Sequence, residues 1–243
     1  MKYWLQGIIL IVLVVLIFIP NKKDRNAVNV LIQKVETPPS LRFDEDPDFP
    51  IPFGYKTQWF AIKTSDTEAV AAALHLTDQK RANWKTGLAG AEEGYYFVAP
   101  PVNGWTLVIN SLMPDLEAEL TSDPLSSPLK AITYLSEAFG EACYFGSHRI
   151  VDYYAWAKAK DGNISRGFGY LGETGSIILD QREVYAEEQK QNSGFDESAS
   201  TNEISVPDEE DVISMAKEWT TDPGMNTGQL DKGSGIAGVR SKR

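Results

Sequence analysis

The chain has 243 residues, 42% of them hydrophobic, and a formal net charge of -11 at pH 7. This length is typical of one globular domain with flanking segments. The acidic balance argues against a nucleic-acid partner, because binding phosphate requires a positive surface, and it is compatible with a basic protein partner. The single cysteine, Cys143, excludes an internal disulfide and a multi-cysteine zinc site.

The chain opens on an apolar segment. Residues 3–20 carry no charge and one strongly polar side chain, Gln6, and the basic run NKKDR follows directly. At about 1.5 Å per residue this segment just reaches the length that crosses a bilayer. It is apolar on every side and lacks the small residues of a signal-peptide cleavage site. We therefore expect a single-pass anchor over residues 1–26, with residues 3–20 in contact with the lipid bilayer.

The expected location is the inner (cytoplasmic) membrane of a bacterium, with the domain on the cytoplasmic side. More basic residues follow the apolar segment than precede it, and basic residues tend to stay in the cytoplasm. A two-residue N-terminal flank is easily left on either side. A cleaved signal peptide is the competing interpretation of the segment.

Composition divides the rest of the chain into a tether, a domain and a tail. Residues 27–53 are rich in proline and acidic residues, which predicts an extended tether. A single domain is expected over residues 54–221, with a polar low-complexity loop at 187–205. Residues 222–243 form a Gly-rich tail. Its GSGIAG run matches G-x-G-x-x-G without the strand–turn–helix context of a dinucleotide site, so we expect a flexible or loosely docked tail.

The first part of the domain is predicted as a strand followed by a helix. Residues 55–64 have apolar side chains on both alternating faces, which indicates an interior strand. Ser65 precedes Glu68 by three residues, and this capping box predicts an alanine-rich helix over residues 66–76. Residues 82–94 are expected to form a loop or an irregular helix.

A hairpin pattern follows over residues 95–110. Asn103-Gly104 suits the positive φ values of a tight turn. Pro100 and Pro101 cannot both lie in a central ladder, so the first strand of this hairpin is an edge strand or ends early.

The second part of the domain predicts a helix, several strands and a last helix. Ser127 and Pro128 are suited to begin a helix over residues 126–140, which ends on a glycine. Strands are expected from residue 143 to about 178. Acidic residues begin a final helix over 206–219, where they suit the helix dipole. The order predicts an α+β domain with an antiparallel or mixed sheet and about three packed helices, preceded by the transmembrane helix.

The strand pairing of the hairpin predicted over residues 152–173 can be counted outward from its turn. With Asp161-Gly162 as a two-residue loop, Trp156 faces Gly167 and Tyr154 faces Gly169. Each ring would then shield a strand glycine on the partner strand. A three-residue loop would remove this match.

The stretch YFGSHRIVDYYAW, residues 144–156, concentrates reactive side chains. Side chains alternate faces along a strand, so His148 is separated from Cys143 and from its neighbours Ser147 and Arg149. Counting every second residue along the strand places four side chains on one face: His148, Asp152, Tyr154 and Trp156. The first three are the candidate catalytic residues of a cleft on that face of the sheet. Of the acids on the sheet, Asp152 or Glu173 is expected to pair with Arg149 or Arg166 as a structural cross-strand ion pair, in preference to a role in general acid–base chemistry. No metal-ligand or cofactor motif is found.

Several fragments together resemble a group of bacterial proteins to which no activity is assigned. They are, in chain order, WFAIKTSDTEAVAAAL, PPVNGWTLVI, FGEACYFGSHRIVDYYAWAKAKDG, GYLGETG and PDEEDVISMAKEW. The resemblance spans about residues 55–238 and implies one domain. It transfers no catalytic residue. The N-terminal segment and residues 190–205 look like additions relative to that group.

Two functions of different classes remain open. The first is a membrane-anchored, non-catalytic module that binds a protein, of which an immunity-like protein that neutralises a toxin is one version. The second is an enzyme whose cleft carries His148, Asp152 and Tyr154. A third interpretation makes the protein a structural component of the envelope. No cofactor, metal or nucleic acid is expected in any of them.

Overall fold

A computed structural model describes residues 41–118, 121–181, 206–226, 228 and 230–240. The compact unit begins at Arg42. The expected anchor over residues 1–26, the first part of the expected tether and the polar loop at 187–205 lie outside the described residues. Within the described ranges, no helix has the length and apolar character needed to cross a membrane.

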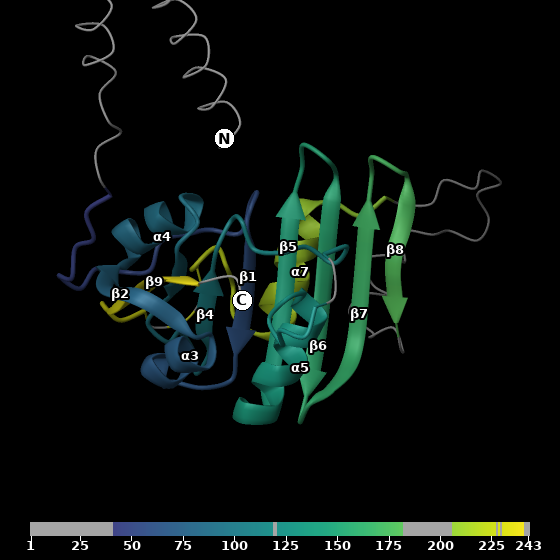
Figure 1. Cartoon of the computed structure of the whole chain (residues 1–243). Helices are drawn as coiled ribbons and strands as arrows, with labels where there is room; N and C mark the ends of the chain where they lie inside the picture. The colour runs from purple at the N-terminus through teal and green to yellow at the C-terminus, as the bar shows by residue number, and fades with distance from the viewer. Residues whose placement is uncertain (1–40, 119–120, 182–205, 227, 229, 241–243) are drawn as a thin grey trace, which may run out of the picture. The chain divides into compact units, whose positions relative to one another are not determined.

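The centre of the fold is one nine-stranded sheet in which every neighbouring pair is antiparallel (Figure 1). The strand order is β2-β9-β3-β4-β1-β5-β6-β7-β8. The α+β class is therefore confirmed, with a purely antiparallel sheet. In chain order the strands are β1 (Gln58–Ile62), β2 (Leu76–Asn83), β3 (Tyr96–Val98), β4 (Thr106–Ile109), β5 (Glu141–His148), β6 (Tyr153–Lys160), β7 (Asn163–Leu171), β8 (Ser176–Gln181) and β9 (Ser234–Arg240).

Helices cover both faces of the sheet. One face packs against α3 (Thr67–Ala73) and α5 (Pro128–Phe139), and the other against α4 (Trp84–Glu92) and α7 (Glu209–Trp219). Figure 1 shows α5 in front of the sheet and α7 behind it. The core is accordingly divided into two clusters, one on each side of the sheet, and the interior strands are buried on both faces.

The strongest local signals produce the elements that they predict. Helix α5 begins with Pro128 in its first turn and ends at Gly140, whose φ is 86°. Helix α7 begins with a capping box between Asp208 and Asp211. The N-cap of α3 is Asp66 and not the predicted Ser65, and the Asp66 side chain accepts the N–H of Ala69 in a single capping bond in place of the predicted capping box with Glu68.

Two elements between residues 76 and 94 differ from the prediction. His75 has a φ of 53°, which ends α3, and the residues that follow form β2. Residues 84–92 form the regular helix α4, which raises the number of described helices to four. Gly87 lets this helix lie close to the sheet, because a side chain at that position would overlap the Phe97 ring. Close packing on the sheet therefore outweighs the low helix propensity of glycine.

Residues 42–53, predicted as part of an extended tether, contact the domain. The Asp48 carboxylate accepts the N–H groups of Trp84 (2.6 Å) and Lys85 (3.1 Å) at the beginning of α4. The Asp48 backbone forms a bridge to Gly233. The segment contributes polar contacts that the proline-rich composition does not reveal, so the domain begins before residue 54.

The prediction of a flexible or loosely docked tail is wrong for residues 234–240. These residues form β9, which lies between β2 and β3 in the interior of the sheet. Gly235 is required for close approach, since a Cβ there would overlap the carbonyl oxygen of Val98. The glycines of GSGIAG therefore serve strand packing and not phosphate binding.

The predicted turn of the β6–β7 hairpin is present, but the register beyond it is shifted. Lys160 faces Asn163, as expected for the Asp161-Gly162 loop. A bulge opposite Lys158 and Ala159 then moves the pairing by one residue. Trp156 therefore faces Phe168, with the two rings stacked 4.5 Å apart, and the glycines face alanines.

Candidate functional site

The structure does not bring the three predicted catalytic residues together. Across the β5–β6 pair, Ser147 faces Tyr154 while His148 faces Tyr153. Tyr154 belongs to the core cluster beside α7, and Tyr153 belongs to the cluster beside α5. His148 and Tyr154 therefore lie on opposite faces of the sheet. The prediction that these residues lie on one face is wrong, because the alternation of side chains along a strand does not continue through the turn at residues 149–152.

Asp152 and Tyr154 do contact each other. Asp152, exposed and with a φ of 48°, accepts the Tyr154 hydroxyl at 3.2 Å. Burial raises the pKa of Tyr154 to about 12, with the hydrogen bond to Asp152 acting in the same direction, so this phenol stays protonated at neutral pH. The pair is a local polar contact beside a turn, and His148 lies on the other face.

The other reactive groups of this stretch are also separated. The Cys143 side chain is fully buried on the α7 face, away from His148, and burial raises the pKa of its thiol well above the ordinary value. His148 is half-buried, and its Nδ1 has no hydrogen-bond partner among the described residues. A thiol–imidazole pair is absent from the described part of the chain.

Two other ion pairs are found in place of the predicted cross-strand ones. Arg166 is 2% exposed and pairs with Asp180 of β8 at 2.7 Å. Arg149 lies 3.8 Å from Glu209 of α7. In the region that the structure describes, these arginines therefore meet carboxylates other than the predicted Asp152 and Glu173.

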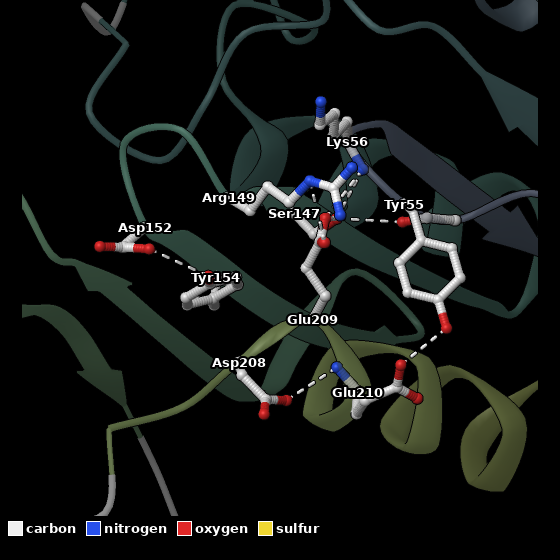
Figure 2. Close-up of polar contacts among 10 residues, drawn as sticks. Tyr55, Lys56, Ser147, Arg149, Asp152, Tyr154, Asp208, Glu209 and Glu210 are labelled. Carbon is white, nitrogen blue, oxygen red and sulfur yellow. Dashed lines mark hydrogen bonds and ion pairs between the residues drawn. The ribbon is translucent and has the colours of Figure 1, made fainter.

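One buried polar cluster of the described residues is one that the sequence did not single out (Figure 2). Glu209, the first residue of α7, is 8% exposed, and its Oε1 accepts the backbone N–H of Lys56 at 3.0 Å. The Ser147 hydroxyl oxygen lies 2.9 Å from the same Oε1 and 3.0 Å from the carbonyl oxygen of Gly54. The Lys56 N–H also reaches Ser147 Oγ at 3.1 Å. These contacts join β5, the segment before β1 and α7.

This Ser147–Glu209 cluster has a structural role. Ser147 is 1% exposed, and its hydroxyl oxygen contacts the Lys56 N–H, the Gly54 carbonyl oxygen and Glu209 Oε1. The Arg149 guanidinium partly balances the Glu209 charge. In the sequence, the acidic run at residues 208–211 indicates only a favourable helix dipole, and the buried contact of Glu209 has no local signal.

The solvent side of this cluster exposes apolar side chains. Tyr55 is 52% exposed and donates its hydroxyl to Glu210 at 2.7 Å, as Figure 2 shows. Ile150 is 74% exposed in the β5–β6 turn, directly after Arg149. We define the Tyr55–Ile150 surface by four exposed apolar residues and three exposed acidic ones: Tyr55, Ile150, Val151, Val206, Asp152, Asp208 and Glu210.

The Tyr55–Ile150 surface comes from three segments held together by the buried cluster. Tyr55 precedes Lys56, whose N–H binds Glu209. Ile150 and Val151 follow Arg149, which lies beside the same carboxylate. Asp208 and Glu210 flank Glu209 at the beginning of α7, and Asp152 belongs to the same turn as Ile150. The buried carboxylate therefore fixes the position of the exposed apolar residues.

Within the residues that the structure describes, no three acidic, histidine or cysteine side chains gather in a group able to hold a metal ion. Three cavities of the described region are lined by residues other than His148, Asp152 and Tyr154. No family model, no curated protein and no solved structure matches this chain, so its function is argued from its own geometry.

Proposed function

We propose that this protein is a non-catalytic binding module whose Tyr55–Ile150 surface holds a protein partner with a basic surface. The observation that carries the proposal is the gathering of exposed apolar side chains beside exposed carboxylates on segments that a buried polar cluster fixes. Tyrosine and aliphatic side chains supply the apolar contact area of protein interfaces, and surrounding charges select the partner.

Charge supports a basic partner. Asp152, Asp208 and Glu210 are exposed, and the whole chain carries a formal net charge of -11. Each of these carboxylates also has a contact within the chain, with Tyr154, the α7 backbone or Tyr55. They remain in solvent, where they attract a cationic surface at long range.

The enzyme alternative built on His148, Asp152 and Tyr154 has no supporting observation, since these side chains divide between two faces of the sheet. The immunity-like version of the binding module keeps its support from charge and size alone. In that version the partner is a toxic protein, and the chain protects cells by covering the basic surface of the toxin.

A photo-crosslinking residue at Ile150, in the full chain expressed in bacterial cells, tests the binding proposal. We expect one main adduct with a basic protein, because Ile150 is the most exposed apolar side chain of the Tyr55–Ile150 surface. The same crosslinker at Phe49, which is 56% exposed elsewhere on the domain, is the matched control and should give no such adduct.

A charge-reversing variant tests whether the adduct depends on the acidic residues of the surface. Glu210→Lys in the Ile150 crosslinking chain should reduce the adduct about tenfold, because it reverses one charge of the surface and removes the acceptor of Tyr55. Added salt should reduce it as well. Equal adducts from Ile150 and Phe49, or an adduct that ignores both Glu210→Lys and salt, would contradict the proposal. If the captured protein is toxic when expressed, protection by the wild type but not by Glu210→Lys supports the immunity-like version.

We further propose that residues 3–20 anchor the chain in the inner membrane, with the domain on the cytoplasmic side. The support is the uncharged apolar segment followed by a basic run. The full chain should remain in the membrane pellet after extraction with alkaline carbonate, and a chain lacking residues 1–26 should be soluble. Protease should digest the domain in inverted vesicles and spare it in intact spheroplasts. Release of the full chain by carbonate would refute the anchor.

A further inference from the structure

A cleft lies on the α3/α5 side of the sheet, and none of its lining residues belongs to the Tyr55–Ile150 surface. It has a volume of about 680 Å³, which is within the range of small-molecule sites. The lining comes from the ends of β3, β4 and β9 and from described residues between β4 and α5, within 110–118 and 121–126. Its lining includes Tyr96, Asn110, Met113, Leu125 and Arg240.

A smaller cavity continues the cleft at its inner end. It has a volume of about 10 Å³, which is room for about one oxygen atom or water molecule. Tyr96, Met113, Leu125 and Arg240 line both spaces, and Ser127 lines the inner one. A ligand in the cleft can therefore place a single polar atom in the inner cavity.

Arg240 presents an unused donor there. Its Nη2 pairs with the Asp123 carboxylate, and its Nη1 donates to the carbonyl oxygen of Leu125 at 3.2 Å. Its Nε is buried and has no partner with hydrogen-bond geometry among the described residues, although the Tyr96 hydroxyl lies near enough to the guanidinium for Arg240 to oppose the rise in the Tyr96 pKa. A buried N–H without an acceptor is costly, which indicates that a water molecule or a ligand oxygen occupies the inner cavity.

Ser127 presents a second unused group. It is the N-cap residue of α5 and is 4% exposed, but its side chain makes no capping hydrogen bond. Its Oγ is buried and has no partner in the described ranges. The 12-residue helix directs its positive dipole end and its unpaired first-turn N–H groups to the same place.

The hydrogen-bond donors at the inner end of the cleft favour a ligand oxygen that carries at most one negative charge. Burial raises the pKa of Tyr96, against the opposing effect of Arg240, so its hydroxyl is neutral at neutral pH. Asp123 balances the single positive charge of Arg240, so the dipole of α5 and the donors of Ser127 and Arg240 remain to stabilise a ligand oxygen, and Asp115 lines the outer cleft. A dianion such as phosphate would meet two carboxylates, whereas a monoanionic carboxylate matches the remaining donors.

Part of the cleft wall is apolar, and hydrogen bonds hold the wall segment in place. Met113 and Leu125 contribute apolar side chains to the lining. The Gln58 amide donates to the carbonyl oxygen of Met113 at 2.9 Å, and the N–H of Leu116 donates to the Tyr153 hydroxyl at 3.1 Å. These bonds tie the wall segment to β1 and β6, so the cleft exists before a ligand binds.

We propose that this cleft binds a small apolar carboxylate, one oxygen of which enters the inner cavity between Ser127 Oγ and Arg240 Nε. The apolar body of the ligand lies in the outer cleft against Met113 and Leu125. The site is independent of the proposed protein-binding surface.

Fluorine NMR with the full chain tests this site, with 4-fluorobenzoate as the probe. We expect saturable binding of 4-fluorobenzoate and at least tenfold weaker binding of 4-fluorobenzamide and 4-fluorophenyl phosphate. The amide lacks the charge that strengthens hydrogen bonds to Arg240, and the phosphate carries too much of it.

Two variants and a control locate the binding. Ser127→Ala and Arg240→Lys should each weaken 4-fluorobenzoate binding about tenfold, since each removes one donor from the inner cavity. Arg81→Lys, an exposed arginine variant on β2 away from the cleft lining, should bind as the wild type does. Thermal unfolding of each variant establishes that it is folded.

The proposal is overturned if 4-fluorobenzoate does not saturate, or if the amide binds equally well. It is also overturned if both inner-cavity variants fold and bind the probe as tightly as Arg81→Lys does. Either result leaves a buried water as the partner of Ser127 and Arg240.

Discussion

Replacing Gly235 by alanine is expected to lower the free energy of unfolding by about 3 kcal/mol. Gly235 lies in β9 between two paired strands, and a Cβ there would overlap the carbonyl oxygen of Val98. A backbone atom in the interior of a sheet cannot move aside without disturbing the ladder on both sides. The expected loss is therefore at the upper end of the usual range for overpacking.

Gly167→Ala in β7 is the matched control. A Cβ at Gly167 would meet Leu179 Cδ2 at 2.9 Å, which is the end of a flexible side chain. The same substitution should therefore change stability by less than about 1 kcal/mol. Urea unfolding followed by circular dichroism measures both variants, and equal midpoints for the two would refute the assigned position of β9.

Glu209→Ala is expected to lower the free energy of unfolding by about 2 to 3 kcal/mol. The change leaves the Lys56 N–H without its carboxylate acceptor and removes the carboxylate partner of Ser147 and Arg149. Each lost contact leaves a buried or partly buried polar group that water cannot fully satisfy. The junction of β5, the segment before β1 and α7 should loosen as a result.

The neighbouring residue provides the control for this variant. Glu210→Ala removes an exposed carboxylate that accepts the hydroxyl of the exposed Tyr55, so its effect should stay below about 0.5 kcal/mol. Thermal and urea unfolding of both variants make the comparison. A Glu209→Ala chain as stable as Glu210→Ala would show that the buried cluster does not hold the three segments together.

Local signals in the sequence predicted a large part of the fold. Pro128 and Gly140 delimit α5, and the acidic residues before residue 212 begin α7. Asn103-Gly104 closes the predicted turn, and the first strand of that hairpin ends at Val98 before the two prolines. Each of these signals acts within a few residues of the element that it determines, so no tertiary information is needed.

The differences arise where distant segments decide the outcome. Residues 234–240 resemble a Gly-rich tail, but β2 and β3 supply pairing partners on both sides. The candidate site failed for the same reason. The turn at 149–152 places His148 and Tyr154 on different faces, and Glu209 reaches Ser147 across 62 residues of chain. No periodicity in one sequence encodes such contacts.

The position of β9 has a consequence for the order in which the domain forms during synthesis. Chains emerge from the ribosome N-terminus first, and β9 is the last of the described strands to be made. Until residues 234–240 emerge, β2 has no described strand beside it, and one edge of β3 is unpaired. Strand β2 therefore joins the sheet only when the final strand has been made, and until then the growing chain exposes an unpaired edge of β3.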